Sequence, residues 1–189
     1  MESILNFLKE HTKSKINPKI VISSKAEAKG LQKASKFEIP TSIISSNSKG
    51  WDYDKEIVRI LQEHDVYPDN GLVCLAGYMR LLSREFVRKY KMRIINIHPS
   101  LLPSFPGLNS QKKALDYGVK VTGCTVHFVD EGLDSGPIIA QRQVAVLEND
   151  TYETLSDRIL EQEHILYPTC VKLFSEKRLL VEGRKVIVT

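Results

Sequence analysis

The sequence has few of the residues that would indicate a secreted, membrane-bound or extended protein. Its three cysteines, Cys74, Cys124 and Cys170, lie far apart. They lack the paired spacing of a zinc site and are odd in number for disulfides, so we expect buried thiols in a reducing compartment. No stretch approaches about 18 uncharged apolar residues, and charges interrupt the apolar N-terminal segment. We therefore expect a soluble, cytoplasmic protein with no membrane partner.

Glycine and proline are also scarce, with 10 and 8 among 189 residues, whereas 42% of the residues are hydrophobic. This composition excludes collagen-like, mucin-like and disordered chains and fits one domain, which we expect to span residues 1–189. The net charge of +4 comes from 27 basic and 23 acidic residues. Such a charge suits an anionic small molecule as well as a nucleic acid, but no basic stripe with interspersed aromatic residues favours a nucleic acid.

Short apolar runs alternate with helical patterns through the first two-thirds of the chain. The helical patterns cover about 1–10, 25–37, 51–64, 83–90 and 111–117, and the apolar runs cover 20–22, 39–44, 72–75 and 94–97. Runs so rich in Val, Ile and Leu are typical of strands buried on both faces. We therefore predict an α/β fold with an open, mostly parallel twisted sheet and helices on both faces. Beyond it we expect strands at 119–129 and 138–147, a helix from 150 to 168 or beyond, and a last strand at 179–188.

Asn96 and His98 lie at the end of one predicted strand. Because residues two apart share a face of a strand, both side chains point toward the crevice where open α/β sheets bind ligands. An amide N–H and an imidazole can together stabilise a tetrahedral oxyanion and supply a proton near neutral pH. An isolated histidine is more often structural, but Pro99 and Pro103, which fix the following loop, favour a functional role.

Two further segments are candidates on weaker grounds. Residues 130–137 are acidic and contain glycine, which is typical of an ordinary turn. If they lie beside His98, the Asp134 carboxylate would favour the charged imidazolium. Met79 and Arg80 follow another predicted strand. They are either a core methionine and a solvated arginine, or an apolar wall with one cation for an anionic ligand.

Together, residues 76–82, 95–107, 126–137 and 162–168 resemble the phosphoribosylglycinamide formyltransferase family, and the resemblance covers nearly the whole chain. It implies a Rossmann-like formyltransferase fold. It also implies transfer of the formyl group from 10-formyltetrahydrofolate to the amine of glycinamide ribonucleotide, in purine biosynthesis and one-carbon metabolism.

Two related families fit the sequence less well. Methionyl-tRNA formyltransferases carry a further C-terminal RNA-binding domain, for which we expect no room in 189 residues. Formyltetrahydrofolate deformylases usually have His-His-Ser-Phe where this chain has His98, Pro99, Ser100 and Leu101. The resemblance therefore favours the purine enzyme, with small-molecule substrates and no nucleic-acid partner, as a monomer or homodimer.

The resemblance also implies roles for individual residues. Asn96 and His98 would stabilise the tetrahedral intermediate, His98 would donate a proton, and Asp134 would keep His98 protonated and relay protons through water. The implied folate-binding residues are Met79, Arg80, Leu81, Leu82, Asn96, Asp130, Glu131, Gly132, Leu133 and Asp134. The implied ribonucleotide-binding residues are Leu160, Glu161, Gln162 and Glu163. No metal or redox cofactor is implied, because the formyl group is already activated on the folate nitrogen.

The sequence departs from the family at two places. Family members begin with a strand and a Gly-x-Gly-Ser-Asn turn that holds the substrate phosphate, and Met1 aligns just after that turn. We therefore expect an N-terminally truncated domain with weakened nucleotide binding and stability. Gly50 stands where relatives often carry an arginine that contacts the folate, a contact that Lys49 or Arg80 could replace. The alternative function is a truncated folate-binding relative without efficient formyl transfer.

Overall fold

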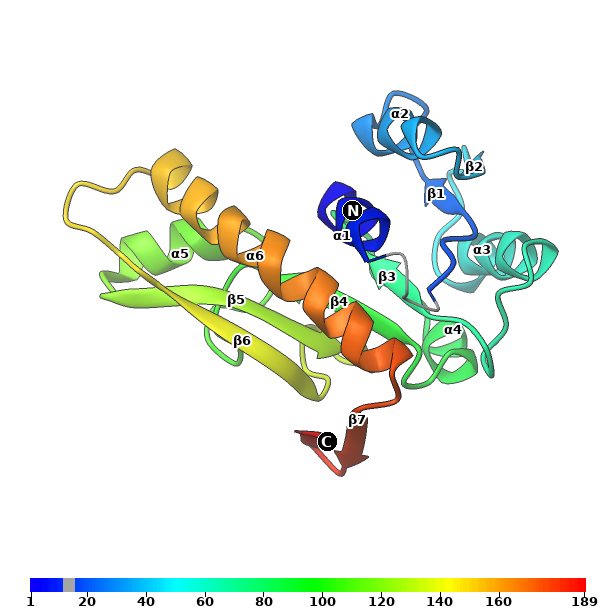
Figure 1. Cartoon of the computed structure of the whole chain (residues 1–189). Helices are drawn as coiled ribbons and strands as arrows, with labels where there is room; N and C mark the ends of the chain where they lie inside the picture. Colours follow the sequence, from blue (N-terminus) through cyan, green and yellow to red (C-terminus); the bar gives the residue numbers. More distant parts are fainter. Residues whose placement is uncertain (12–15) are drawn as a thin grey trace. The chain divides into compact units, whose positions relative to one another are not determined.

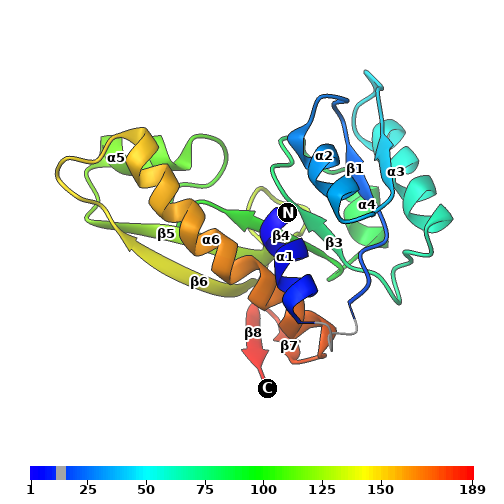
Figure 2. The same cartoon turned by 45° about the horizontal axis from the view of Figure 1, so that its top comes forward.

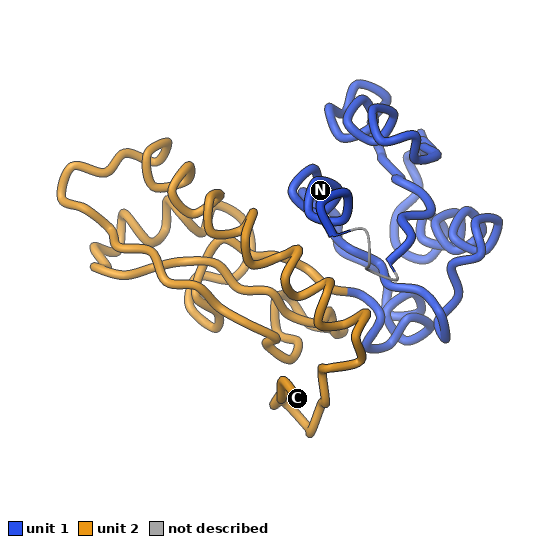
Figure 3. Tube along the Cα trace, in the orientation of Figure 1, with its two compact units in different colours: residues 1–94 blue, residues 95–189 orange. Residues whose placement is uncertain are grey.

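The computed structural model describes residues 1–11 and 16–189, in which helices and strands follow one another in the predicted order (Figure 1). Residues 1–94 form unit 1, and residues 95–189 form unit 2 (Figure 3). The single domain expected over residues 1–189 stays a prediction.

Unit 1 contains a parallel strand pair joined by a helix. Its elements are α1 (Glu2–Glu10), β1 (Val21–Ser23), α2 (Lys29–Lys36), β2 (Thr41–Ile43), α3 (Trp51–Glu63), β3 (Val73–Leu75) and α4 (Arg84–Lys89). Strands β1 and β2 run parallel, and α2, which connects them, packs against both (Figure 2). Helix α2 begins later than predicted, because Ser23 Oγ accepts the backbone N–H of Lys25 and the next residues form a turn.

Helix α3 supplies much of the core of unit 1. The apolar face that the sequence predicts, which includes Ile57, Ile60 and Leu61, is buried. Asp54 is buried as well, because its Oδ2 accepts the backbone N–H of Ser83 at 2.6 Å. Ser83 caps α4, so this hydrogen bond fixes the start of one helix on another.

Unit 2 is built on a sheet with one long helix against it. Its elements are β4 (Ile94–His98), α5 (Ser110–Tyr117), β5 (Val121–Phe128), β6 (Ile138–Ala145), α6 (Tyr152–Ser175), β7 (Leu179–Glu182) and β8 (Lys185–Val188). The strands lie in the order β4, β5, β6, β8, β7. Helix α6 packs against β5 and β6 (Figure 1).

The predicted α/β class is confirmed, and the structure refines the strand directions. The pairs β1–β2 and β6–β8 are parallel, whereas β4–β5, β5–β6 and β7–β8 are antiparallel. Residues 129–137 are too few for the crossover helix that a parallel β5–β6 connection would need. The last predicted strand is a hairpin instead, because Gly183 with φ +60° allows a turn between β7 and β8.

Helix α6 begins where its sequence predicts. Thr151 Oγ1 accepts the backbone N–H of Thr154 at 3.3 Å, and Thr154 Oγ1 accepts that of Thr151 at 2.9 Å, which forms a capping box. The helix continues past Pro168 to Ser175. Among the helices that the structure describes, none is long and apolar enough to cross a membrane.

Candidate active site

Four polar side chains form a patch on one face of the paired strands β4 and β5. His98 stands opposite Thr125, and Asn96 stands opposite His127. Opposed residues of an antiparallel pair share a face, as do alternate residues of one strand, so all four lie on the same side of the sheet. The patch therefore arises from two local patterns, Asn-Ile-His in β4 and Thr-Val-His in β5.

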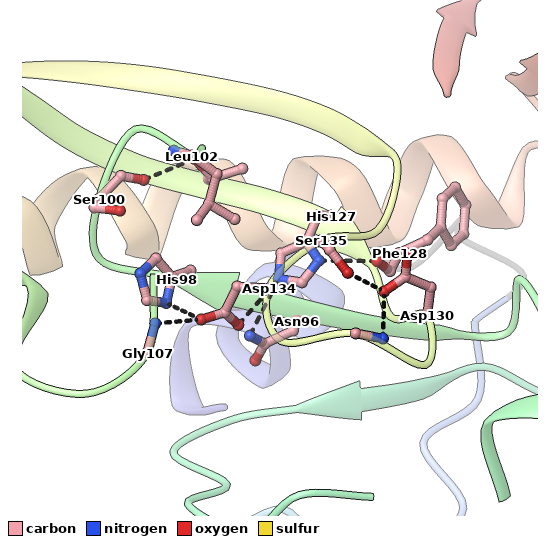
Figure 4. Close-up of polar contacts among 12 residues, drawn as sticks. Asn96, His98, Ser100, Leu102, Gly107, His127, Phe128, Asp130, Asp134 and Ser135 are labelled. Carbon is pink, nitrogen blue, oxygen red and sulfur yellow. Dashed lines mark hydrogen bonds and ion pairs between the residues drawn. The ribbon is translucent and has the colours of Figure 1, made fainter. Parts of the chain in front are cut away.

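His98 has an oxygen acceptor beside each of its ring nitrogens, and Figure 4 shows the one that belongs to Asp134. Nδ1 lies 3.3 Å from Asp134 Oδ2, and Nε2 lies 2.9 Å from the carbonyl oxygen of Phe105. Only the imidazolium has N–H groups on both nitrogens, so only the charged ring donates to both acceptors. The residue is 5% exposed. This burial strengthens the hydrogen bonds relative to the same pair in water.

Asp134 reaches the histidine from the loop between β5 and β6. Its backbone is left-handed, with φ +48°, a conformation that aspartate adopts more readily than most residues. Its Oδ2 also accepts the backbone N–H of Gly107 at 2.8 Å (Figure 4). The loop is braced internally, because Asp130 Oδ1 accepts from Ser135 Oγ at 2.6 Å and from the backbone N–H of Gly132 at 3.1 Å. The carboxylate is thus held from two loops.

Asn96 is oriented by His127, a residue that the sequence analysis did not single out. His127 Nδ1 donates to the carbonyl oxygen of Phe128 at 2.8 Å, and its Nε2 lies 3.3 Å from Asn96 Nδ2. Burial lowers the pKa of His127, so the neutral ring accepts at Nε2 from the amide. The second N–H of Asn96 makes no hydrogen bond among the described residues. His127 Nε2 is 3.8 Å from Asp134 Oδ1, which is too far for a hydrogen bond.

The folate residues predicted in unit 1 follow β3. Met79 is 77% exposed, so it is not the core methionine of the simpler interpretation, and Leu81 is 76% exposed. Leu82 is half-buried. The Arg80 guanidinium lies 3.7 Å from the centre of the Tyr53 ring, a cation–π contact that fixes the cation instead of leaving it in solvent.

The remaining predicted ligand residues lie in unit 2. In the loop after β5, Glu131, Gly132 and Leu133 are exposed, whereas Asp130 and Asp134 are half-buried. On α6, Leu160 and Glu161 are exposed, and Gln162 and Glu163 are half-buried. Burial raises the pKa of Glu163 to about 7, so this carboxyl group titrates near neutral pH.

A hollow of about 500 Å³ in unit 1 contains none of the predicted site residues and lies between residues 42–48 and α3. Its charged side chains pair with one another: Lys55 with Asp52 at 2.8 Å and Arg59 with Glu56 at 3.1 Å. Among the described residues, no group of three or more His, Cys, Asp or Glu side chains is arranged to hold a metal ion.

Comparison with known proteins identifies the family to which the chain belongs. Residues 1–171 match the family model described as formyl transferase. The chain is 41% identical over 173 residues to phosphoribosylglycinamide formyltransferase of Bacillus subtilis (strain 168), covering 90% of this chain and 86% of that protein. It is 46% identical over 175 residues to trifunctional purine biosynthetic protein adenosine-3 of Gallus gallus, covering 92% of this chain and 17% of that protein.

The fold also matches solved structures. The crystal structure of glycinamide ribonucleotide transformylase 1 from Symbiobacterium toebii gives a TM-score of 0.92 at 44% identity, covering 99% of this chain and 87% of that chain. The chain therefore belongs to the formyl transferase family, as its sequence motifs predict.

Proposed function

We propose that this protein transfers the formyl group of 10-formyltetrahydrofolate to the amine of glycinamide ribonucleotide. The likeness to the Bacillus subtilis phosphoribosylglycinamide formyltransferase over most of both chains supports the reaction. The observation that carries the mechanism is the contact of 3.3 Å between His98 Nδ1 and Asp134 Oδ2, on the same face of the sheet as Asn96.

The first step forms the tetrahedral intermediate. The amine nitrogen attacks the formyl carbon, a new C–N bond forms, and the carbonyl electron pair moves to oxygen. Asn96 donates its second amide N–H to this oxyanion, while the His98 imidazolium, whose two N–H groups face Asp134 and Phe105, supplies positive charge nearby. His127 keeps the amide of Asn96 in the donating orientation before substrate arrives.

The second step releases tetrahydrofolate. The oxyanion re-forms the carbonyl group as the bond between the formyl carbon and the folate nitrogen breaks. That nitrogen takes the proton of His98 Nδ1, whose 3.3 Å contact with Asp134 is longer than the 2.9 Å contact of Nε2 with Phe105. The proton that the amine loses passes through water beside Asp134 and returns to His98. The amine therefore loses one proton and the folate nitrogen gains one, so the enzyme ends the cycle unchanged.

Separate residues are proposed to bind each substrate. Residues 130–134 of unit 2 contribute folate contacts, and exposed Leu133 offers apolar surface to the pterin. Residues 160–163 contact the ribonucleotide, where Glu163 offers a half-buried carboxylate. Cys124 and Cys170 are buried as free thiols, which is in keeping with the cytoplasmic location that we propose.

The test incubates the protein with 10-formyltetrahydrofolate and glycinamide ribonucleotide and follows both products by mass spectrometry. We expect formylated ribonucleotide and tetrahydrofolate in equal amounts. Formate release without formylated ribonucleotide would indicate a hydrolase. Folate binding without any turnover would favour the alternative, a folate-binding relative that does not transfer the formyl group.

A further inference from the structure

The loop that follows β4 orients both members of the proposed acid pair through its backbone. The Phe105 carbonyl oxygen contacts His98 Nε2, and the Gly107 N–H contacts Asp134 Oδ2. These two backbone groups are close in sequence, within residues 99–107. Any shift of this loop would therefore disturb the histidine and the carboxylate together.

The hydroxyl group of Thr125 anchors the start of this loop. Thr125 Oγ1 donates to the carbonyl oxygen of Ser100 at 2.7 Å and accepts the backbone N–H of Leu102 at 3.0 Å. Thr125 and Ser100 are both 0% exposed, so bulk water cannot replace these bonds. Within the loop, Ser100 Oγ donates to the carbonyl oxygen of Ser104 at 2.5 Å, which extends the constraint toward Phe105.

Gln141 completes this anchor from the next strand. It stands opposite Thr125 on β6, and its Nε2 lies 2.8 Å from the carbonyl oxygen of Leu102 and 2.9 Å from Thr125 Oγ1. One amide group thus donates both to the loop backbone and to the hydroxyl that holds it. Gln141 itself is an exposed residue, although its amide group reaches buried Thr125.

We propose that Gln141 is a positioning residue for formyl transfer, acting through Thr125 and the loop of residues 99–107. This inference rests on the proposed function. If the amide donor is lost, Leu102 is held by one hydrogen bond fewer and the loop occupies a wider range of positions. The Phe105 carbonyl and the Gly107 N–H then orient His98 and Asp134 less well, and displacements of about 1 Å are enough to slow an enzyme strongly.

Gln141→Glu tests the inference because it keeps the side-chain length but replaces the donating NH₂ group by an acceptor. The matched control is Gln143→Glu, which adds the same charge to the same face of the same strand, where Gln143 makes no side-chain hydrogen bond among the described residues. We expect Gln141→Glu to lower kcat about 10-fold to 100-fold while the KM of each substrate stays within about twofold. Gln143→Glu should leave kcat unchanged.

A second pair of variants removes the donor without adding charge. We expect kcat to be lower in Gln141→Met than in Gln143→Met, as it is expected to be for the two glutamate variants. This pair tests the positioning role even if Gln141→Glu does not fold. Equal kcat values in the two methionine variants would overturn the inference.

A measurement independent of activity is the exchange of the His98 Nε2 proton with water, followed at low temperature by NMR on protein labelled with ¹⁵N-histidine. The Gln141 variants should speed this exchange, and the Gln143 variants should not. Unchanged exchange, or faster exchange with unchanged kcat, would contradict a positioning role in catalysis. If the wild-type protein shows no formyl transfer, the proposed function fails instead, and the exchange rates still show whether Gln141 holds the loop.

Discussion

Two half-buried carboxylates of unit 2, Asp150 and Asp134, have very different surroundings. Asp150 accepts hydrogen bonds from the two terminal guanidinium nitrogens of Arg158, at 2.7 and 2.8 Å. It also accepts from Thr154 Oγ1 at 2.9 Å and from the backbone N–H of Leu147 at 2.7 Å. The Arg158 hydrogen bonds are the main reason that the pKa of Asp150 lies well below its usual range. Its donors are permanent, so this carboxylate stabilises the start of α6 and has no capacity left for chemistry.

Asp134 has one permanent donor, the backbone N–H of Gly107, and one donor that can lose its proton, the ring of His98. A carboxylate in such surroundings can change the protonation of its neighbour during a reaction, whereas Asp150 cannot. We propose that this difference, in the kind of donor each carboxylate faces, distinguishes a structural acid from a catalytic one.

The largest effect is expected from Asn96→Ala. The substitution removes the oxyanion donor, so kcat should fall about 100-fold to 1000-fold, a loss typical of one oxyanion-hole group. Steady-state kinetics measure the loss, and circular dichroism should show an unchanged fold. Asn149→Ala, at an exposed position in the loop before α6, is the control and should retain full turnover. Wild-type turnover in Asn96→Ala would remove the residue from the mechanism.

Asp134→Asn should have the next largest effect. Asparagine also tolerates a left-handed backbone, so the loop should persist while the negative charge beside His98 is lost. We expect kcat to fall about 10-fold to 100-fold, because the charged form of His98 loses its partner. The control is Asp116→Asn, which removes an exposed ion pair with Lys112. Equal kcat values for the two variants would show that Asp134 is as structural as Asp150.

Glu163→Gln should change the pH dependence of stability. Because burial raises the pKa of Glu163 to about 7 from its usual 4.5, its contribution to stability is complete below pH 4.5 and is lost as the pH rises through 7. The variant should therefore match the wild type near pH 4.5 and exceed its free energy of unfolding at pH 8 by about 3 kcal/mol, since each pKa unit corresponds to about 1.4 kcal/mol. Urea unfolding at both pH values measures this. Glu161→Gln, an exposed neighbour, should show no such difference, and a variant less stable at pH 8 would contradict the assignment.

Thr151→Ala should have the smallest effect, and it should lower stability only, because Thr151 caps α6 next to Asp150. Loss of the helix cap costs about 1 kcal/mol, measured by urea unfolding, with no change in kcat. Thr151→Ser keeps the hydroxyl group and should restore most of the stability. A large fall in kcat in Thr151→Ala would show that the start of α6 is coupled to the reaction.

The sequence predicted the features that local patterns control. Helix α3 follows from its apolar periodicity, and α6 begins at Thr151 because its cap is encoded within a few residues. The pairing of Asn96 with His98 on one face follows from strand alternation alone. The contact between Asp134 and His98 could not be predicted from their spacing in the sequence, because it depends on how the loop after β5 folds back toward β4.

The residues that the sequence analysis missed depend on strand register. Thr125 and His127 are polar residues at alternate positions of a largely buried strand, a signal that was present in the sequence. Their partners could not be predicted, because the register of β4, β5 and β6 is set by tertiary packing and shifts between Val126 and His127. Gln141 gave no signal at all, since an exposed glutamine in a strand is ordinary.

A double-mutant cycle of His98→Ala and Asp134→Asn tests the account most directly. If the two side chains act as one proton-transferring pair, the double variant should have nearly the same kcat for formyl transfer as His98→Ala alone. If the two losses multiply instead, the histidine and the carboxylate work independently, and the contact between them is not the basis of the reaction.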